Sequence, residues 1–203
     1  MNYATLKTFI AGELNRQDLA ASIPIFIELA EAGLNRALRH RRMLERATNT
    51  SSDHFLALPD DFLQAKNIQL NTDPVTVLTY VTMEQADLLR SGKYSVPGQP
   101  RYYTIVGETI EFTPVPDIDY TTELTYYVKL ETLSDTVLSN WLLAAYPDAY
   151  LYGALLHSAP YLKDDARIPI WDGIYQRTIE EINREGDRSE VSGATPRART
   201  FVW

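Results

Sequence analysis

The segment Asn140-Trp-Leu-Leu-Ala-Ala-Tyr-Pro-Asp-Ala-Tyr-Leu-Tyr-Gly-Ala-Leu-Leu-His157 lies in the last third of the chain and is rich in aromatic and aliphatic residues. It predicts a helix over about 137–159, with Pro147 marking the place where that helix could break. A second helix is expected over about 164–185, because apolar residues recur there at a spacing of three to four. Gly186 is expected to end this second helix. The chain from about 137 to 185 is therefore predicted to be mostly helical.

The N-terminal residues also predict two helices. Apolar residues at helical spacing indicate a short amphipathic helix over residues 5–14. Ser22 is a good N-cap for a second helix, which is expected to run to about Arg42. An apolar stripe along this second helix is formed by Ile23, Ile27, Ala30, Leu34 and Leu38.

From Glu45 onward the pattern changes to short runs that alternate or carry β-branched and aromatic residues. The clearest hairpin runs from Tyr103 to Phe112 with Gly107 at the bend. Thr82 and Gln85 have the spacing of a capping box and predict a short helix to about Leu89. The predicted strands are 45–50, 54–58, 65–70, 75–80, 101–106, 109–113 and 121–128.

These elements predict an α+β fold in which the N- and C-terminal helices form one helical bundle. An antiparallel β unit of about seven short strands is inserted between them. The polar residues 187–203 are expected to be irregular or extended and to lie outside the core. The expected parts are the N-terminal helices (1–44), the β unit (45–133), the C-terminal helices (134–186) and the extended tail (187–203).

The composition excludes several classes of protein. The chain has 203 residues, a net charge of −8 and no cysteine. A chain without cysteine has no disulfides, no thiolate zinc site and no thiol nucleophile. A net negative charge is unfavourable for tight nucleic-acid binding. No signal peptide and no apolar stretch long enough to cross a membrane is visible in the sequence.

A basic cluster interrupts this acidic background and consists of Arg36, Arg39, Arg41, Arg42 and Arg46. Cations suit the C-terminus of a helix, so these side chains could simply pair with nearby carboxylates and carbonyl groups. They could instead form a subunit interface with the acidic surface of a second copy. A third interpretation is contact with nucleic acid that passes through a pore without sticking to it.

No convincing catalytic, cofactor or metal site is predicted, so the chain is not expected to be an enzyme. His54 follows Asp53, and Asp60 and Asp61 lie nearby in sequence, which is the pattern of a base or a metal site. However, these aspartates stand in turn contexts, where Asp caps the backbone. His157 lies in an apolar helix and is expected to be a core or interface residue. The aspartates 164 and 165 open a helix, and Asp117 and Asp119 flank a proline turn without a cation-binding spacing.

A series of short segments spread over most of the chain is similar, in order and composition, to one family of structural proteins. In these segments the chain resembles the head–tail adaptor proteins, also called connector or gateway proteins, of tailed double-stranded DNA bacteriophages. The segments are Tyr3-Ala-Thr-Leu-Lys7, Ile25-Phe-Ile-Glu-Leu-Ala-Glu-Ala-Gly-Leu-Asn-Arg-Ala-Leu-Arg39, Leu58-Pro-Asp-Asp-Phe62, Tyr103-Thr-Ile-Val-Gly107, Leu124-Thr-Tyr-Tyr127, Leu133-Ser-Asp135, Asn140-Trp-Leu-Leu143 and residues 147–167.

The resemblance implies a structural virion protein that forms a ring, expected to be dodecameric, in the neck between head and tail. Such a ring docks on the portal protein and extends the DNA channel. It also gives tail or nozzle proteins a platform for attachment. Double-stranded DNA would pass through it without sequence-specific binding, and no membrane is involved. The protein would be made in the cytoplasm of the bacterial host and function in the virion.

The resemblance also assigns a role to the C-terminal tail, which we expect to reach the portal. Its candidate portal-binding residues are Arg197, Arg199, Phe201 and Trp203. Aromatic side chains at the end of the chain could enter a groove of the partner, while the arginines meet carboxylates. A tail without a role, or one that packs on its own molecule, is the alternative.

Two other functions remain open on the sequence alone. The acidic, tyrosine-rich β unit is compatible with a receptor- or carbohydrate-binding β module of a phage tail. A small glycan hydrolase would need two carboxylates that face each other across a cleft. The candidates for such a pair are Asp60, Asp61, Glu108 and Glu111.

Overall fold

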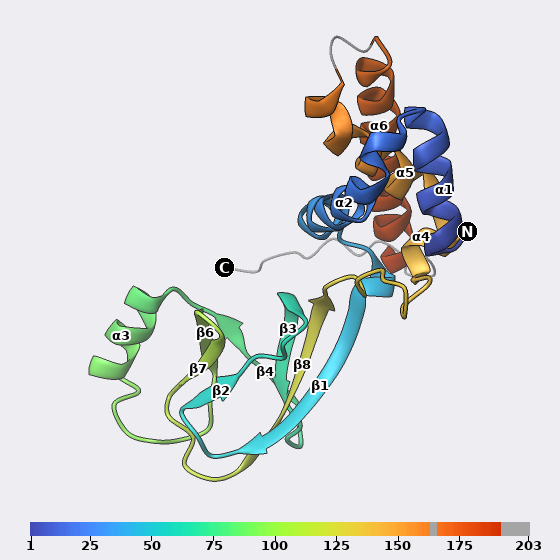
Figure 1. Ribbon diagram of the computed structural model, residues 1–203. Coiled ribbons are helices and arrows are strands. Elements are labelled where there is room, and N and C mark those ends of the chain that lie inside the picture. The colour runs from blue at the N-terminus through green and yellow to red at the C-terminus, as the bar shows by residue number, and fades with distance from the viewer. Residues whose placement is uncertain (163–165, 192–203) are drawn as a thin grey trace. The chain divides into compact units, whose positions relative to one another are not determined.

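The computed structural model describes residues 1–162 and 166–191. The chain forms two units (Figure 1). The helical unit comprises Met1–Met43 and the chain from Leu130 onward, and the β unit is Leu44–Lys129. The described part of the chain contains six α-helices and two sheets of four strands each. The predicted α+β class is therefore confirmed.

The helical unit is built around α5 (Pro147–Ser158), which contacts α1 (Tyr3–Leu14), α2 (Ile23–Ala37), α4 (Trp141–Ala145) and α6 (Ile168–Val191). Helices from the two ends of the chain thus share one core. The side chains fully removed from solvent there include Leu6, Ile10, Ile27, Leu34, Leu142, Tyr150, Leu155 and Ile182.

Two predicted helix boundaries in this unit are wrong. The second helix ends at Ala37 rather than near Arg42, because Leu38 adopts an extended backbone, and a 3₁₀ turn follows at Arg41–Met43. The predicted helix 137–159 is two helices, α4 and α5. Asn140 caps the first through its Oδ1, which accepts from the Leu143 N–H at 2.9 Å. Pro147 occupies the first turn of the second, where its missing N–H costs nothing.

The prediction that Gly186 ends the last helix is also wrong, because α6 continues to Val191. A Cβ at position 186 would lie 3.1 Å from the Arg39 carbonyl oxygen and 3.2 Å from the His40 ring. The glycine is therefore required by close packing of α6 against the chain that leaves α2, and not by a change of backbone direction. Residues 187–191 of the predicted tail are helical, and residues 192–203 lie outside the described part.

The β unit contains two sheets. The first has the strand order β1 (Leu44–Ser51), β8 (Tyr120–Val128), β3 (Phe62–Leu70) and β4 (Thr76–Val77). The second has the order β2 (Phe55–Ala57), β7 (Thr109–Thr113), β6 (Tyr102–Val106) and β5 (Thr79–Tyr80). Residues from both sheets meet in one core: Ile68, Leu70, Leu78, Tyr103, Ile110, Phe112, Leu124 and Tyr126.

Several details of the β unit differ from the sequence prediction. The predicted strand 75–80 is divided into β4 and β5, one in each sheet, because the chain crosses between the sheets at the buried Leu78. The pair β5–β6 is parallel, although an antiparallel unit was expected. The predicted hairpin is confirmed, with Gly107 at φ +60°, and so is the capping box of α3 (Met83–Ser91), which lies beside β6 and β7 (Figure 1).

Candidate interaction surfaces

The arginine cluster divides between the two units. Arg36 lies exposed in the last turn of α2, and Arg41 and Arg42 are exposed in the 3₁₀ turn that follows. The Arg39 Nη1 donates to the carbonyl oxygens of Asn35 at 3.0 Å and Leu38 at 2.5 Å. This arginine therefore caps the C-terminal carbonyls of α2, as the simplest interpretation predicts.

Arg46 belongs to the β unit, where it lies on β1 and pairs with Glu123 of β8 at 3.8 Å. Its side chain is 73% exposed, so this ion pair contributes little to stability. Arg46 therefore keeps its charge available at the surface.

His40 supports the turn that carries Arg41 and Arg42. This residue is buried, and its ring stacks on Trp141 of α4 with the ring centroids 5.2 Å apart. Its Nδ1 accepts a hydrogen bond from the Arg42 backbone N–H at 3.2 Å, and the Arg42 guanidinium lies over the Trp141 ring at 5.9 Å. Trp141 and His40 thus fix the turn that presents Arg41 and Arg42.

A buried carboxyl group anchors the chain where it returns from the β unit. Glu31 of α2 is 4% exposed and accepts hydrogen bonds from the Leu133 N–H at 2.9 Å and the Tyr150 hydroxyl at 3.3 Å. Asn140 donates to the Tyr150 hydroxyl at 2.7 Å and to the Glu131 carbonyl at 2.8 Å. These side chains tie residues 131–140 to α2 and α5. We call this group the carboxyl clamp (Glu31, Leu133, Asn140, Tyr150).

Burial raises the pKa values of two side chains in the clamp, Glu31 and Tyr150. It raises the pKa of Glu31 to about 7, although the hydrogen bonds from Leu133 and Tyr150 oppose this change. Burial also raises the pKa of the Tyr150 hydroxyl. Sequence reasoning did not identify Glu31 as important. The sequence did carry a sign of its burial, because Glu31 stands beside Ala30 and Leu34 on the apolar face of the predicted helix.

His54 forms a different contact from the one the sequence suggests. Its Nε2 lies 3.3 Å from the Glu111 carboxylate and 3.1 Å from the Arg90 guanidinium, and Arg90 forms an ion pair with Glu111. Burial, and then the positive charge of Arg90, lower the pKa of His54. The Arg90–Glu111 ion pair links α3 to β7, and the His54 ring lies against this pair.

Three of the other acidic residues considered from the sequence accept hydrogen bonds from hydroxyl groups. Asp53 accepts from the Ser51 hydroxyl at 2.9 Å, and Asp61 accepts from the Tyr126 hydroxyl at 3.0 Å. Asp117 accepts from the Tyr120 hydroxyl at 2.7 Å. His157 is half-buried on α5, and burial and the Arg36 charge lower its pKa. Within the described residues no three acidic or histidine side chains are grouped as a metal site would require.

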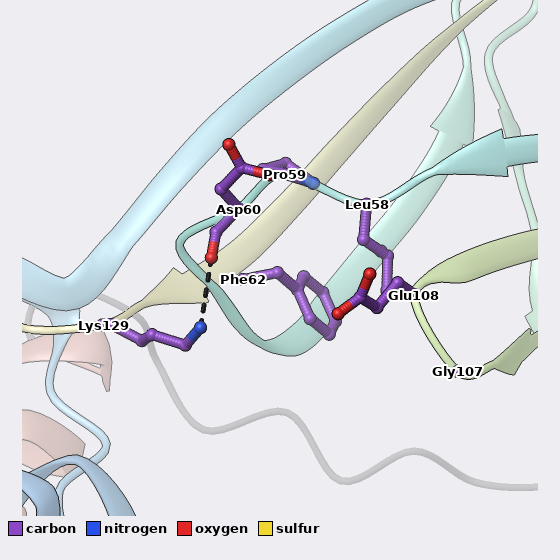
Figure 2. A pocket seen from close by; sticks show the side chains of 7 residues that line it. All are labelled: Leu58, Pro59, Asp60, Phe62, Gly107, Glu108 and Lys129. Carbon is purple, nitrogen blue, oxygen red and sulfur yellow. Dashed lines mark hydrogen bonds between the residues drawn. The ribbon is translucent and has the colours of Figure 1, made fainter.

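Asp60 and Glu108 do share a hollow of about 260 Å³ in the β unit, which we call the acidic pocket. Figure 2 shows the side chains of Lys129 and Glu108 entering it from opposite sides. The Lys129 ammonium donates to the backbone carbonyl of Asp60 at 3.1 Å and not to its carboxylate. The pocket is lined by Leu58, Pro59, Asp60, Phe62, Gly107, Glu108 and Lys129.

Some predicted sites cannot be placed. The portal-binding candidates Arg197, Arg199, Phe201 and Trp203, and the aspartates 164 and 165, lie outside the described residues. Among the helices that the structure does describe, none combines the length and the apolar character of a membrane span.

The chain matches a family model described as SU10 adaptor protein over residues 1–199. The match extends over both units and confirms the resemblance to phage head–tail adaptor proteins. No curated protein matches the chain.

Proposed function

The chain belongs to the SU10 adaptor protein family, and on this basis we propose that it is a ring subunit joining the head of a tailed phage to its tail. The observation that carries the proposal is the family match over residues 1–199, which includes both units. The ring, of twelve copies as the resemblance implies, docks on the portal protein. It extends the DNA channel and offers its far face to tail proteins.

The division of the chain into a helical unit and a β unit supports this proposal. In the helical unit, elements from both ends of the chain contact α5, so it is a suitable rigid body for packing side by side as a bundle. The β unit has its own core and can present a separate surface. A closed ring repeats one weak contact many times, which gives lasting attachment without a strong single interface.

The arginine cluster is assigned to the inner contacts of the ring, with the next subunit or with DNA in the channel. Arg36, Arg41 and Arg42 are exposed, and His40 and Trp141 hold the turn that carries the last two. A chain with a net charge of −8 does not retain DNA by counterion release, which suits a channel through which DNA must move.

The C-terminal residues beyond α6 are assigned to the portal. Between Val191 and the end of the chain stand two arginines and no acid, followed by Phe201 and Trp203. Cations with an aromatic terminus suit a partner groove bordered by carboxylates.

Co-sedimentation with the portal protein of the same phage tests this assignment. The full chain is compared with a chain that ends at Val191 and with the double variant Phe201→Ala/Trp203→Ala. The matched control is Ser192→Ala/Thr195→Ala, which changes the same segment without removing aromatic or charged groups. We expect the control to sediment with the portal and the other two to be lost or weakened. Undiminished binding of the shortened chain would refute the role of the tail.

A further inference from the structure

The two sheets of the β unit leave two free edges that border the same hollow. In the described part of the chain β1 pairs only with β8, and β2 pairs only with β7. Between them lies a groove of about 170 Å³, lined by residues 47–49 of β1, residues 56–59 in and after β2, and Thr122 and Leu124 of β8. We call it the edge groove.

The edge groove has the properties of a place where a strand can be added. Its lining includes the aliphatic side chains of Leu56, Leu58 and Leu124. β1 has eight residues, pairs with β8 without a register shift, and contains neither proline nor glycine. Every second residue of such an edge directs its N–H and C=O groups away from the sheet. Proline, a bulge and a short length, which block many edge strands, are missing from β1, and its two charged residues, Glu45 and Arg46, stand together near its start.

The edge groove and the acidic pocket are neighbours, because Leu58 and Pro59 line both. Asp60 and Glu108 are exposed there, and their two negative charges outnumber the one positive charge of Lys129, whose ammonium donates to a backbone carbonyl. The β unit as a whole contains six basic and twelve acidic residues. This charge selects a basic occupant for the pocket and disfavours an acidic one.

We propose that the edge groove and the acidic pocket together bind an extended, basic segment of a partner protein. The segment adds to β1 as a strand, places alternate apolar side chains in the groove, and places a lysine or arginine beside Asp60 and Glu108. That this partner is a tail protein rests on the proposed function, whereas the chemistry of the segment rests on the β unit alone.

The probe is a set of overlapping synthetic peptides that cover the portal and tail proteins of the same phage, each long enough to span the eight residues of β1. Binding to the full chain is followed by fluorescence anisotropy. We expect the peptides that bind to come from a tail protein and to combine alternating apolar residues with a lysine or arginine. Amide hydrogen exchange in residues 44–51 should slow when such a peptide is added.

Two variants with matched controls locate the site. Ala57→Trp fills the groove at an exposed position, and Thr79→Trp makes the same change at the exposed β5 edge of the same sheet. Asp60→Lys/Glu108→Lys reverses the charge of the pocket, and Asp73→Lys/Asp119→Lys reverses two exposed charges elsewhere in the unit. The groove and pocket variants should bind the peptides about tenfold more weakly, and the controls should bind as the parent chain does.

The proposal is overturned if no peptide binds, if the groove and pocket variants bind as well as their controls, or if the binding peptides are acidic. Binding peptides that come only from the portal would overturn the assignment to a tail protein. Docking of the same variants on the portal is measured in parallel. Variants that fail to bind peptide but still dock on the portal separate a failure of this site from a failure of the adaptor function.

Discussion

Replacing the buried Glu31 by glutamine should make the helical unit more stable at high pH and leave it nearly unchanged at low pH. Burial raises the pKa of this carboxyl from its ordinary 4.5 to about 7 in the folded chain. The folded state therefore keeps the proton over a pH range in which the unfolded state releases it. The stability contributed by the protonated clamp is full below pH 4.5 and is lost as the pH rises to about 7.

The size of the effect follows from this change in pKa. A carboxyl whose pKa moves from 4.5 to about 7 on folding loses about 3 kcal/mol of stability between these two pH values. Glutamine has a similar shape, and its Oε1 can still accept from the Leu133 N–H and the Tyr150 hydroxyl, but it does not ionise. The Glu31→Gln chain should therefore gain up to about 3 kcal/mol over the parent at pH 8.

The assay is urea unfolding of the full chain at pH 5 and pH 8, followed by the fluorescence of Trp141 and Trp171, which both belong to the helical unit. Glu181→Gln is the control, because Glu181 is exposed on α6 of the same unit. Glu31→Ala should destabilise the chain at both pH values, by about 1–3 kcal/mol for each buried donor left without an acceptor. An equal difference between parent and Glu31→Gln at both pH values would refute the argument.

Three further predictions concern packing, ion pairing and ligand class. Gly186→Ala should destabilise the chain by about 1–3 kcal/mol, because the new Cβ would meet Arg39 and His40. Gly173→Ala in the same helix, where a Cβ has nothing within 4 Å, should stabilise the chain by up to about 1 kcal/mol. Urea unfolding measures both variants, and a stabilising Gly186→Ala would contradict the close packing at that position. Arg90→Ala should cost about 3–5 kcal/mol and speed amide exchange in α3, because Glu111 loses a buried partner. Arg184→Ala, at an exposed position of α6, should change stability by less than about 1 kcal/mol. Equal effects of the two variants would be evidence against the buried pair. A glycan array should show no binding to the full chain, and a specific hit abolished by Glu108→Gln would favour the carbohydrate-binding alternative.

Features that depend on neighbouring residues were predictable from the sequence. The apolar spacing of Leu6, Ile10 and Leu14 predicted α1, and the Thr82–Gln85 pair predicted the start of α3. Gly107 predicted the bend of the β6–β7 hairpin. Each of these signals lies within a few residues of the structure it specifies, so no tertiary information was needed.

Features that depend on distant residues were missed. Gly186 has the local signature of a helix end, but its role is set by Arg39 and His40, which are far away in sequence. The division of strand 75–80 between two sheets depends on the burial of Leu78 in a core formed by both. His54 was considered with its sequence neighbours, although its partners Arg90 and Glu111 come from α3 and β7.

The candidate surfaces show the same limit. The arginine cluster was visible as a run of charge, but the stacking of His40 on Trp141 that fixes its turn was not. The edge groove had no signal in the sequence, because it arises from strand order and not from any motif.

Electron microscopy of portal particles of the same phage, mixed with the purified full chain, tests whether this protein is a head–tail adaptor. The adaptor function predicts a ring of added density on one face of the portal, coaxial with its channel and with one subunit of this chain per repeat. Portal particles that remain bare at saturating concentrations of a folded chain would contradict it.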